Sequence, residues 1–368
     1  MALVHLLALL LPCSSFEVPA LAAGACGQNK FYKWRGYRTR YVALNEDAPA
    51  DAPTLLLVHG LFVNADHWRK NLPALAASGC RVFAVDLLGC GYSDKPAPSD
   101  ADARAASGEK DRPQSVTVGD LGTAGGKTRS NIAVDQLHPV NGSPYNFFTW
   151  AEQLRDFSKD VMGCSAERPA TLVCNSIGTI SGLQAAVDEP ALFSGVLAVA
   201  PNFRELHAAE QPSFLRPVVA AVQSALRSNG APLFDALATP STVRAILESQ
   251  PYYDKSAVTE ELVECLLRPL LTAGSSAIVF DTLSYSAGPL PEQLLQDPRL
   301  AKTPVWVCYG DKDPWTPGAR VEALSRFGPV QKVVTLPNCG HCPHDEAPDL
   351  VNPLILDFVK HLQESKAQ

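Results

Sequence analysis

A serine stands where an apolar run changes into a helical pattern. The run 172–175 leads directly into Ser176, and Gly178 follows two residues later. A serine on such a tight turn from strand to helix is exposed at the edge of a sheet, and its neighbours two positions away must be small. Gly178 meets this condition, and Cys174, which stands where the usual pattern has a glycine, is also small. Ser176 is therefore a candidate nucleophile, and the alternative is a serine that only caps the helix.

Two later apolar runs end in loops that could activate this serine. The run 305–310 leads to Asp311 and Asp313, and the run 333–336 leads to His341, with His344 one helical turn later. A serine hydroxyl is a poor nucleophile until an imidazole takes its proton, and the imidazole needs a carboxylate to fix its tautomer. We choose Asp313 because it lies further past the strand and precedes a proline, so Asp311 is assigned to a turn. We choose His341 because it directly follows a glycine after the strand.

A serine nucleophile also needs backbone donors for the developing oxyanion. One donor is the amide of Ile177, directly after the serine. The other comes from the loop after His59 and Gly60, so Leu61 and Phe62 are the candidates. His59 lies at a strand end and is assigned a structural hydrogen-bonding role.

These residues need a mostly parallel sheet to bring them to one edge. The runs 54–59, 81–86, 171–175, 195–200, 304–309 and 332–336 read as buried strands, after an early antiparallel strand at 37–42. Helical patterns at 68–77, 150–162, 178–187 and 347–363 alternate with them. This order predicts an α/β fold, with a twisted sheet flanked by helices over residues 31–200 and 300–366.

Two segments interrupt that pattern. Residues 97–143 are rich in Ala, Ser, Gly, Asp and Lys without a sustained apolar period, and are interpreted as a low-complexity surface insertion. Residues 201–299 are helical in texture and predict a cap over the carboxyl edge of the sheet. Most of the cap's periodic apolar residues, Val218 and Val222 among them, are expected to be ordinary core. Phe203, Phe214 and Phe234 are candidates for lining a substrate pocket beneath it.

Composition excludes several classes of protein. Hydrophobic residues make up 46% of the 368 residues and the net charge is −7, which argues against a disordered chain and against a nucleic-acid binder. The ten cysteines are scattered, and Cys339 and Cys342 have no second pair at zinc-binding distance. We therefore expect no cofactor and no metal, and a small-molecule partner. The oligomeric state is left open.

The N-terminus has the features of a cleaved leader. Residues 1–12 form a leucine-rich run that is too short to span a bilayer, and a small-residue site follows at 20–22. We expect a leader over residues 1–25 and no stable membrane span.

Several short segments resemble the α/β-hydrolase superfamily: VHG at 58–60, DLLGCGYSDKP at 86–96, CNSIG at 174–178, GDKDPW at 310–315 and GHCP at 340–343. Within it, DHWRKN at 66–71, YSDKP at 92–96 and the asparagine before the serine resemble the pheophytinase-like branch of plants and algae. The resemblance implies an α/β-hydrolase fold with a helical cap and hydrolysis of a bulky apolar ester, such as the phytyl ester of a chlorophyll derivative. It also implies a plastid location, for which secretion or an endomembrane lumen is the alternative.

Other activities stay open on this fold. Dehalogenases and epoxide hydrolases resemble the chain but attack with an aspartate where it has Ser176. A carbon–carbon hydrolase or a lyase would use the same triad, and a non-catalytic ligand receptor could retain it.

Overall fold

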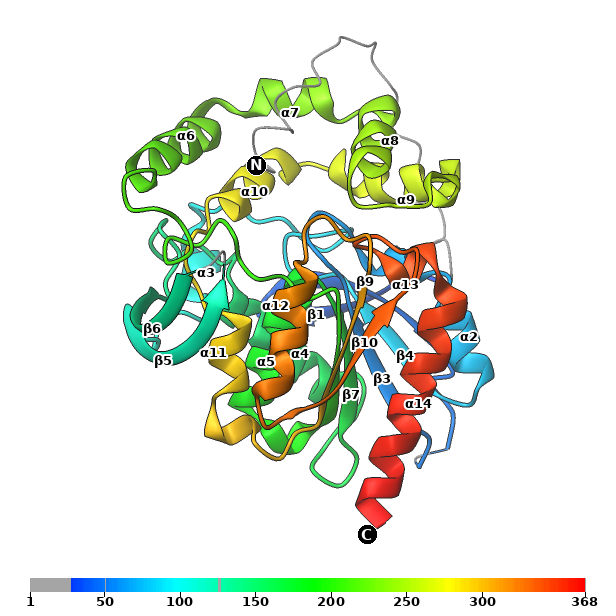
Figure 1. Cartoon of the computed structure of the whole chain (residues 1–368). Helices are drawn as coiled ribbons and strands as arrows, with labels where there is room; N and C mark the ends of the chain where they lie inside the picture. The colour runs from blue at the N-terminus through cyan, green and yellow to red at the C-terminus, as the bar shows by residue number, and fades with distance from the viewer. Residues whose placement is uncertain (1–27, 50, 125–126, 368) are drawn as a thin grey trace.

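The computed structural model describes residues 28–49, 51–124 and 127–367, so the expected leader at 1–25 lies outside the described residues. Its centre is an eight-stranded sheet in the order β1-β2-β4-β3-β7-β8-β9-β10 (Figure 1). β1 and β2 pair antiparallel, β2 joins β4 antiparallel, and every later neighbour is parallel. The predicted α/β-hydrolase fold with a mostly parallel sheet is confirmed. The strands are β1 (Lys30–Trp34), β2 (Tyr37–Leu44), β3 (Thr54–Val58), β4 (Arg81–Val85), β7 (Ala170–Asn175), β8 (Phe193–Val199), β9 (Val305–Gly310) and β10 (Val330–Leu336).

The central strands are apolar on both sides because helices cover both faces of the sheet. Along β3, Leu56 and Val58 pack into one core while Leu55 and Leu57 pack into the other. The first core includes α4 (Phe147–Asp160) and α5 (Ile177–Asp188), and the second includes α2 (Leu72–Ala77) and α14 (Pro348–Ala367). A parallel sheet buried in this way needs continuous apolar runs, which is why its strands could be found in the sequence.

The interrupted region 97–143 contains regular structure that its composition does not suggest. After the short helix α3 (Ala101–Ala105), strands β5 (Ser115–Ala124) and β6 (Lys127–Asp135) form an antiparallel hairpin outside the main sheet. Val116, Val118 and Ile132 of the hairpin pack on a small core around Leu121, Val134 and Leu290. The missed signal was the alternation of these apolar residues on either side of Gly125-Gly126, a dipeptide favoured in two-residue hairpin loops.

A group of four buried charges ties the hairpin to the main body. Arg129 of β6 lies 2.6 Å from Glu210 and 2.9 Å from Glu292, and Arg320 contacts the same two carboxylates at 2.9 and 2.7 Å. All four side chains are less than a tenth exposed. Buried charges need such pairing, because an unpaired one would be strongly destabilising.

Helices between β8 and β9 lie over the carboxyl edge of the sheet as the cap, which here means residues 201–290 (Figure 1). They are α6 (Arg216–Asn229), α7 (Ala231–Leu237), α8 (Pro240–Ser249), α9 (Glu260–Leu270) and α10 (Ser275–Leu283). The next helix, α11 (Pro291–Leu295), packs instead on α5 of the core. Leu262 and Leu266 of α9 are buried, as expected, but Val218 and Val222 of α6 are exposed rather than core.

One bent pair of cap helices has the composition of a membrane span. Within the described ranges, no single helix is long and apolar enough to cross a bilayer. Helices α9 and α10, which are bent by 94° relative to each other, meet the length and composition criteria only when taken together.

The contact between Cys174 and Gly182 predicts a reversal in the effect of one substitution. A methyl group added at Gly182 of α5 would lie 2.5 Å from Cys174 Sγ, whereas the next nearest atom, Cys174 Cβ, is 3.6 Å away. Gly182→Ala should therefore destabilise the protein by about 1–2 kcal/mol through overpacking. In a Cys174→Ala background the same change should stabilise by up to about 1 kcal/mol, because alanine is the better helix former. Urea unfolding of the four proteins measures this, and a Gly182→Ala effect of the same sign in both backgrounds would contradict it.

Candidate active site

Ser176 occupies the turn between β7 and α5 with a strained backbone. Its φ of 53° and ψ of −120° lie in a region that L-residues rarely adopt. The turn is tight because the start of α5 presses against the end of β3, where a Cβ at Gly178 would lie 2.6 Å from the carbonyl oxygen of His59. The Ser176 amide donates to Val199 O of β8 at 3.0 Å, which fixes the turn to the neighbouring strand.

The structure brings Ser176, His341 and Asp313 into one hydrogen-bonded chain. His341 Nε2 lies 3.0 Å from Ser176 Oγ, and His341 Nδ1 lies 2.8 Å from Asp313 Oδ2. All three side chains are buried or nearly so, and they come from the ends of β7, β9 and β10. Because Asp313 accepts from Nδ1, Nε2 is free to accept the serine proton, which is the arrangement of an activated nucleophile.

Asp313 is held as a carboxylate by the loop that carries it. Its Oδ1 accepts from the amides of Trp315 at 2.8 Å and Thr316 at 3.0 Å. Burial alone would raise the pKa of Asp313, but His341 and these donors outweigh it and lower the pKa below its ordinary value. Asp311, in contrast, accepts from the amide of Asn338 and pairs with Lys312 at the surface. Asp313 therefore contacts His341, whereas Asp311 contacts the surface turn at Asn338.

The loop after β3 carries Leu61 and Phe62, the two residues from which we expect the second oxyanion donor. Phe62 has a φ of 58°, so the backbone turns sharply just after Leu61. His59 is buried and spans two strand ends: its Nε2 accepts from the amide of Leu87 at 3.1 Å, so its Nδ1 donates to Gly60 O at 2.7 Å. Burial lowers the pKa of His59, which keeps the ring neutral in this structural role. Ile177, the first residue of α5, is also buried beside Ser176.

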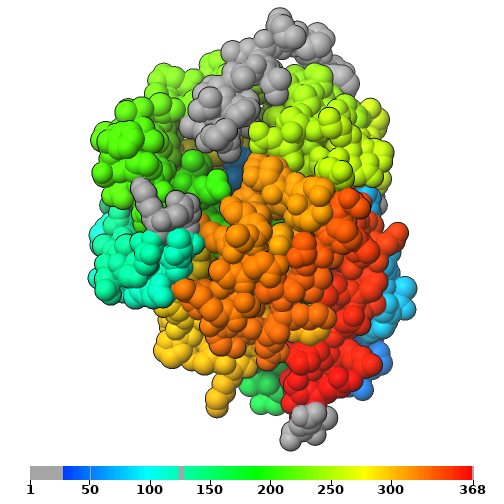
Figure 2. Space-filling model, in the orientation of Figure 1, coloured from blue at the N-terminus to red at the C-terminus, as the bar shows by residue number. Residues whose placement is uncertain are grey.

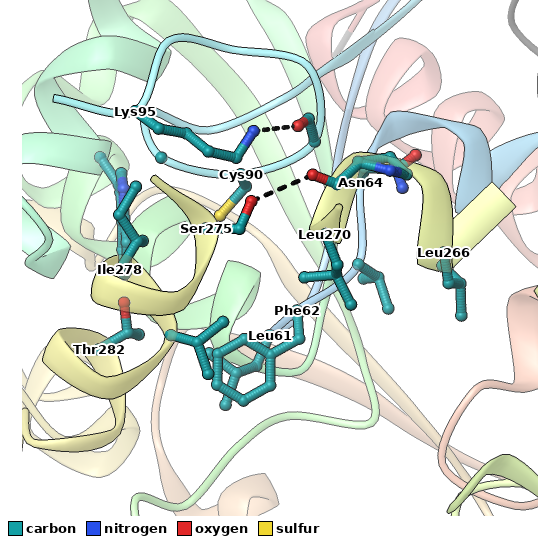
Figure 3. Close-up of a pocket in the computed structure, with 16 residues that line it drawn as sticks. Leu61, Phe62, Asn64, Cys90, Lys95, Leu266, Leu270, Ser275, Ile278 and Thr282 are labelled. Atoms are coloured by element: carbon teal, nitrogen blue, oxygen red, sulfur yellow. Dashed lines mark hydrogen bonds between the residues drawn. The ribbon is translucent and has the colours of Figure 1, made fainter. Parts of the chain in front are cut away.

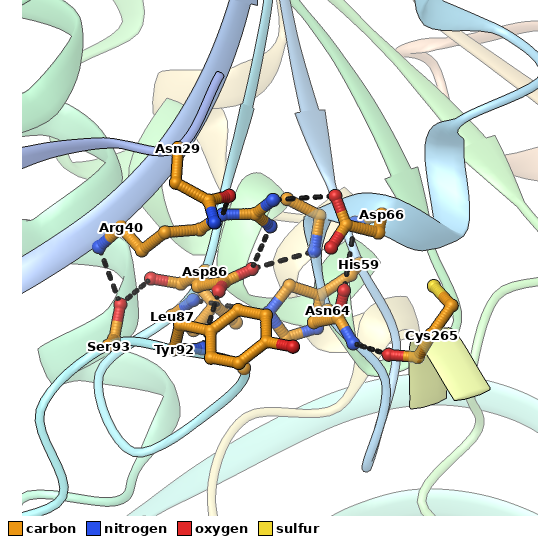
Figure 4. A network of polar contacts seen from close by, with 12 residues as sticks. Asn29, Arg40, His59, Asn64, Asp66, Asp86, Leu87, Tyr92, Ser93 and Cys265 are labelled. Atoms are coloured by element: carbon orange, nitrogen blue, oxygen red, sulfur yellow. Dashed lines mark hydrogen bonds and ion pairs between the residues drawn. The ribbon is translucent and has the colours of Figure 1, made fainter. Parts of the chain in front are cut away.

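A buried ionic network supports this loop from below (Figure 4). Arg40 of β2 lies between Asp66 at 2.5 Å and Asp86 at 3.4 Å, and all three side chains are at most 5% exposed. Asp86 also accepts from the amides of Ala65 and Tyr92, both at 2.7 Å. One carboxylate at the end of β4 therefore fixes the loops after both β3 and β4.

An apolar pocket lies between this loop and the cap (Figure 3). Leu61 and Phe62 line it from the core, Leu266, Leu270 and Ile278 line it from α9 and α10, and Lys95 adds one ammonium group. Burial lowers the pKa of Lys95, whose Nζ donates to the carbonyl oxygens of Gly91 and Ser93. The free volume of the pocket is only about 30 Å³, and Ser176 and His341 are not among its lining residues.

None of the three phenylalanines expected to line a pocket lies at this one. Phe203 is buried in the main core, with the Arg320 guanidinium 4.4 Å from its ring centre. Phe214 is 75% exposed beside α6, and Phe234 is half-buried on α7. Helical spacing identified apolar residues of the cap but could not give the side of the cap on which each one lies. The lining residues came instead from α9, α10 and the loop at 61–64.

A short cap segment that the sequence analysis missed, residues 250–251, contacts the loops that carry Asp313 and His341. The His341 amide donates to Pro251 O at 2.7 Å, and Trp315 Nε1 donates to Gln250 Oε1 at 2.7 Å. The Trp315 ring in turn packs edge-on against His341, with ring centres 4.9 Å apart. No local pattern marks residues 250–251, because their role depends only on where the cap returns to the core.

His344 has a structural role that is separate from that of His341. It is fully buried, its Nε2 lies 3.2 Å from His67 Nδ1, and its ring packs at a tilt against Trp68, with ring centres 4.2 Å apart. His67 Nε2 lies 2.9 Å from the Tyr252 hydroxyl, which donates to Asp345 at 2.9 Å. Burial lowers the pKa of both histidines well below the ordinary value, so the pair is neutral.

The cysteine pair at 339 and 342 is present as free thiols. Cys339 and Cys342 are both free and buried, and burial raises the pKa of Cys339 to about 11. Across the described ranges, no three His, Cys, Asp or Glu residues are grouped so that they could hold a metal ion.

A sheet of this topology, with a serine, an acid and a histidine at successive strand ends, defines an α/β-hydrolase. The comparison with family models agrees: residues 55–354 match the alpha/beta hydrolase family, and the chain belongs to that family. Among solved structures, epoxide hydrolase VrEH1 from Vigna radiata superposes with a TM-score of 0.61 at 16% identity, covering 91% of this chain and 98% of that one. This likeness shows the fold alone.

Two curated relatives differ in how much of the chain they match. The chloroplastic pheophytinase of Arabidopsis thaliana is 26% identical over 329 residues, which is 85% of this chain and 62% of the relative. A haloalkane dehalogenase of Mycobacterium marinum is 47% identical, but over 51 residues only, which is 14% of this chain and 17% of the relative. The chain therefore spans less than two thirds of the length of either.

The neutral pair His67 and His344 predicts a loss of stability in acid. The pKa of each histidine in the folded protein lies below its value of about 6.5 in the unfolded chain. Between the folded and unfolded pKa values the unfolded chain binds more protons than the folded protein. Lowering the pH therefore lowers the free energy of unfolding. Each histidine should add roughly 1.4 kcal/mol per pH unit to that slope below pH 6.5. His344→Gln should make the slope shallower, as measured by urea unfolding between pH 7.5 and 5.5. His361→Gln, at the surface of α14, is the matched control, and an equal slope in the two variants would contradict the prediction.

Proposed function

We propose that the protein is a serine hydrolase that cleaves a carboxylic ester of a bulky apolar substrate through an acyl-enzyme. The observation that carries this proposal is the chain of contacts from Ser176 Oγ through His341 to Asp313, at 3.0 and 2.8 Å. A serine in this arrangement attacks a carbonyl carbon and leaves an ester on its own oxygen. Membership of the alpha/beta hydrolase family supports hydrolysis as the reaction class.

The reaction begins when His341 Nε2 takes the proton of Ser176 as its Oγ attacks the ester carbonyl. The tetrahedral oxyanion accepts hydrogen bonds from the amide of Ile177 and from that of Leu61 or Phe62. Protonated His341 then gives its proton to the departing alcohol, and Asp313 stabilises the imidazolium throughout. Water, activated by the same imidazole, releases the acid and restores Ser176.

The substrate class follows from the pocket and from the pheophytinase relative. Leu61 and Phe62, the candidate oxyanion residues, line the pocket together with apolar residues of α9 and α10, and this lining favours an apolar substrate. A phytyl ester of a chlorophyll derivative fits this chemistry, and the name of the relative supports it together with a plastid location. Because the free volume is about 30 Å³, α9 and α10 must move apart from the 61–64 loop before a long chain can enter.

Replacing the nucleophile tests the proposal directly. A fluorophosphonate probe should label the wild type at Ser176, and Ser176→Ala should abolish labelling and reduce ester turnover about 10⁴-fold or more while leaving the urea midpoint unchanged. Turnover is measured on p-nitrophenyl esters from acetyl to palmitoyl and on pheophytin, where kcat/KM should rise with chain length. Labelling of folded wild type at another serine, or none at all, would refute the assignment and favour a ligand receptor.

The two carboxylates of the acid loop provide a matched pair of variants. Asp313→Asn should reduce kcat on the order of 10⁴-fold, because an amide cannot hold the tautomer in which His341 Nε2 accepts a proton. Asp311→Asn should change kcat less than about threefold, since its carboxylate only organises a surface turn. Equal losses in the two variants at unchanged stability would show that the acid has been misassigned.

A further inference from the structure

The loop that carries Asp313 brings a second polar side chain to the imidazole. Thr316 Oγ1 lies 3.2 Å from His341 Nδ1, the same nitrogen that lies 2.8 Å from Asp313 Oδ2. Residues 311–317 form a surface loop after β9, in the orange region that borders the yellow-green cap in Figure 2, yet Thr316 is only 1% exposed. A threonine on a surface loop is ordinarily exposed to water, so its inward position indicates a role in the site.

The sequence of the loop fixes the position of this hydroxyl. A proline follows both Asp313 and Thr316, and proline restricts the residue before it to extended backbone conformations. Asp313 Oδ1 accepts from the amides of Trp315 and Thr316, so the carboxylate and the hydroxyl belong to one short turn. Threonine is also branched at Cβ, which restricts rotation of its side chain. The hydroxyl is therefore held at His341 before a substrate binds.

The direction of these hydrogen bonds follows from the charge of Asp313. Burial raises the pKa of Asp313, but His341 and then the Thr316 side chain outweigh burial and lower it, so the group is a carboxylate. A carboxylate at 2.8 Å accepts the proton that His341 carries on Nδ1. Thr316 Oγ1 lies near the same N–H and is its second acceptor, as in other shared hydrogen bonds. The proton of the hydroxyl is then available to the carboxylate.

We propose that Thr316 is a positioning residue, whose hydroxyl holds the His341 imidazole in the tautomer and orientation that accept the Ser176 proton. This role rests on the proposed function. When the imidazole takes the serine proton it becomes a cation, and both of its N–H groups then need acceptors. The Nδ1–H keeps two of them, Asp313 and Thr316, while the Nε2–H faces the oxygen of the departing alcohol. Thr316 thus acts through the base and the acid.

Replacement of threonine by valine isolates the hydroxyl, because a methyl group of similar size takes its place. Thr316→Val should lower kcat on p-nitrophenyl butyrate about tenfold, as expected for the loss of one hydrogen bond to a charged group. Acylation and deacylation both use His341, so KM should change less than about twofold. The rate of fluorophosphonate labelling at Ser176 should fall by the same factor as kcat. Thr316→Ser keeps the hydroxyl and should retain at least about half of kcat.

A second buried threonine supplies the matched control. Thr303 precedes β9 at the end of the strand opposite the triad and is 4% exposed, so Thr303→Val should leave kcat and KM unchanged. Urea midpoints of all variants show whether each one is folded. Thr316→Ala and Thr316→Ser repeat the comparison with smaller side chains, and the serine variant should turn over about five- to tenfold faster than the alanine variant.

The possible results are distinct from one another. Wild-type kcat in folded Thr316→Val would overturn the inference, because the side chain would then only fill space. Equal kcat values in Thr316→Ser and Thr316→Ala would overturn it as well, since the hydroxyl would not be the group that matters. In both of these cases the wild type is an active esterase. A wild type that neither reacts with the probe nor cleaves any ester would refute the proposed function, and this inference with it.

Discussion

The close approach of α5 to the end of β3 is the constraint on which the site depends. Gly178 leaves only enough room for a hydrogen where its Cβ would otherwise meet the carbonyl oxygens of His59 and Val58. That approach closes the turn at Ser176 and forces its φ to 53°, which lifts the hydroxyl to the edge of the sheet. A strained backbone of this kind persists only where the surrounding structure holds it in place. Here the packing around α5, which is buried along almost its whole length, holds the turn.

The sequence could predict that Ser176, Asp313 and His341 would lie close together, because a parallel sheet brings successive strand ends to one edge. β7 and β9 are apolar runs buried on both faces, and β10 is a partly exposed edge strand. Each is followed within a few residues by Ser176, Asp313 or His341. Parallel strands end at the same edge, so these loops had to converge. Asp313 is the carboxylate that contacts the imidazole, because it lies two residues further from the strand than Asp311 and can turn back under the ring.

The sequence does not show which side of a cap helix faces the core and which side faces solvent. The spacing of Val218 and Val222 is typical of a helix, and it is the same whether the two side chains face the core or solvent. In the structure both are exposed, whereas Gln223 of the same helix is buried. Phe203 and Phe214 lie in the segment that precedes α6, whose path over the core no sequence spacing encodes. The contacts of Gln250 and Pro251 with the acid and base loops arise from the path of the cap, which no local pattern encodes.

The cap is therefore attached to the core unevenly, and this bears on how a substrate enters. Residues 250–252 hold the cap by hydrogen bonds to Trp315, His341 and Asp345, so movement there would disturb the triad itself. Around the pocket, α9 and α10 meet the 61–64 loop mainly through apolar side chains, with Asn64 Nδ2 donating to Cys265 O as a polar link. Apolar contacts are non-directional and can slide, whereas the hydrogen bonds at 250–252 cannot. We expect the pocket to open by a shift of α9 and α10, with α6 moving together with them. The hydrogen bonds of residues 250–252 would meanwhile keep His341 and Asp313 in position.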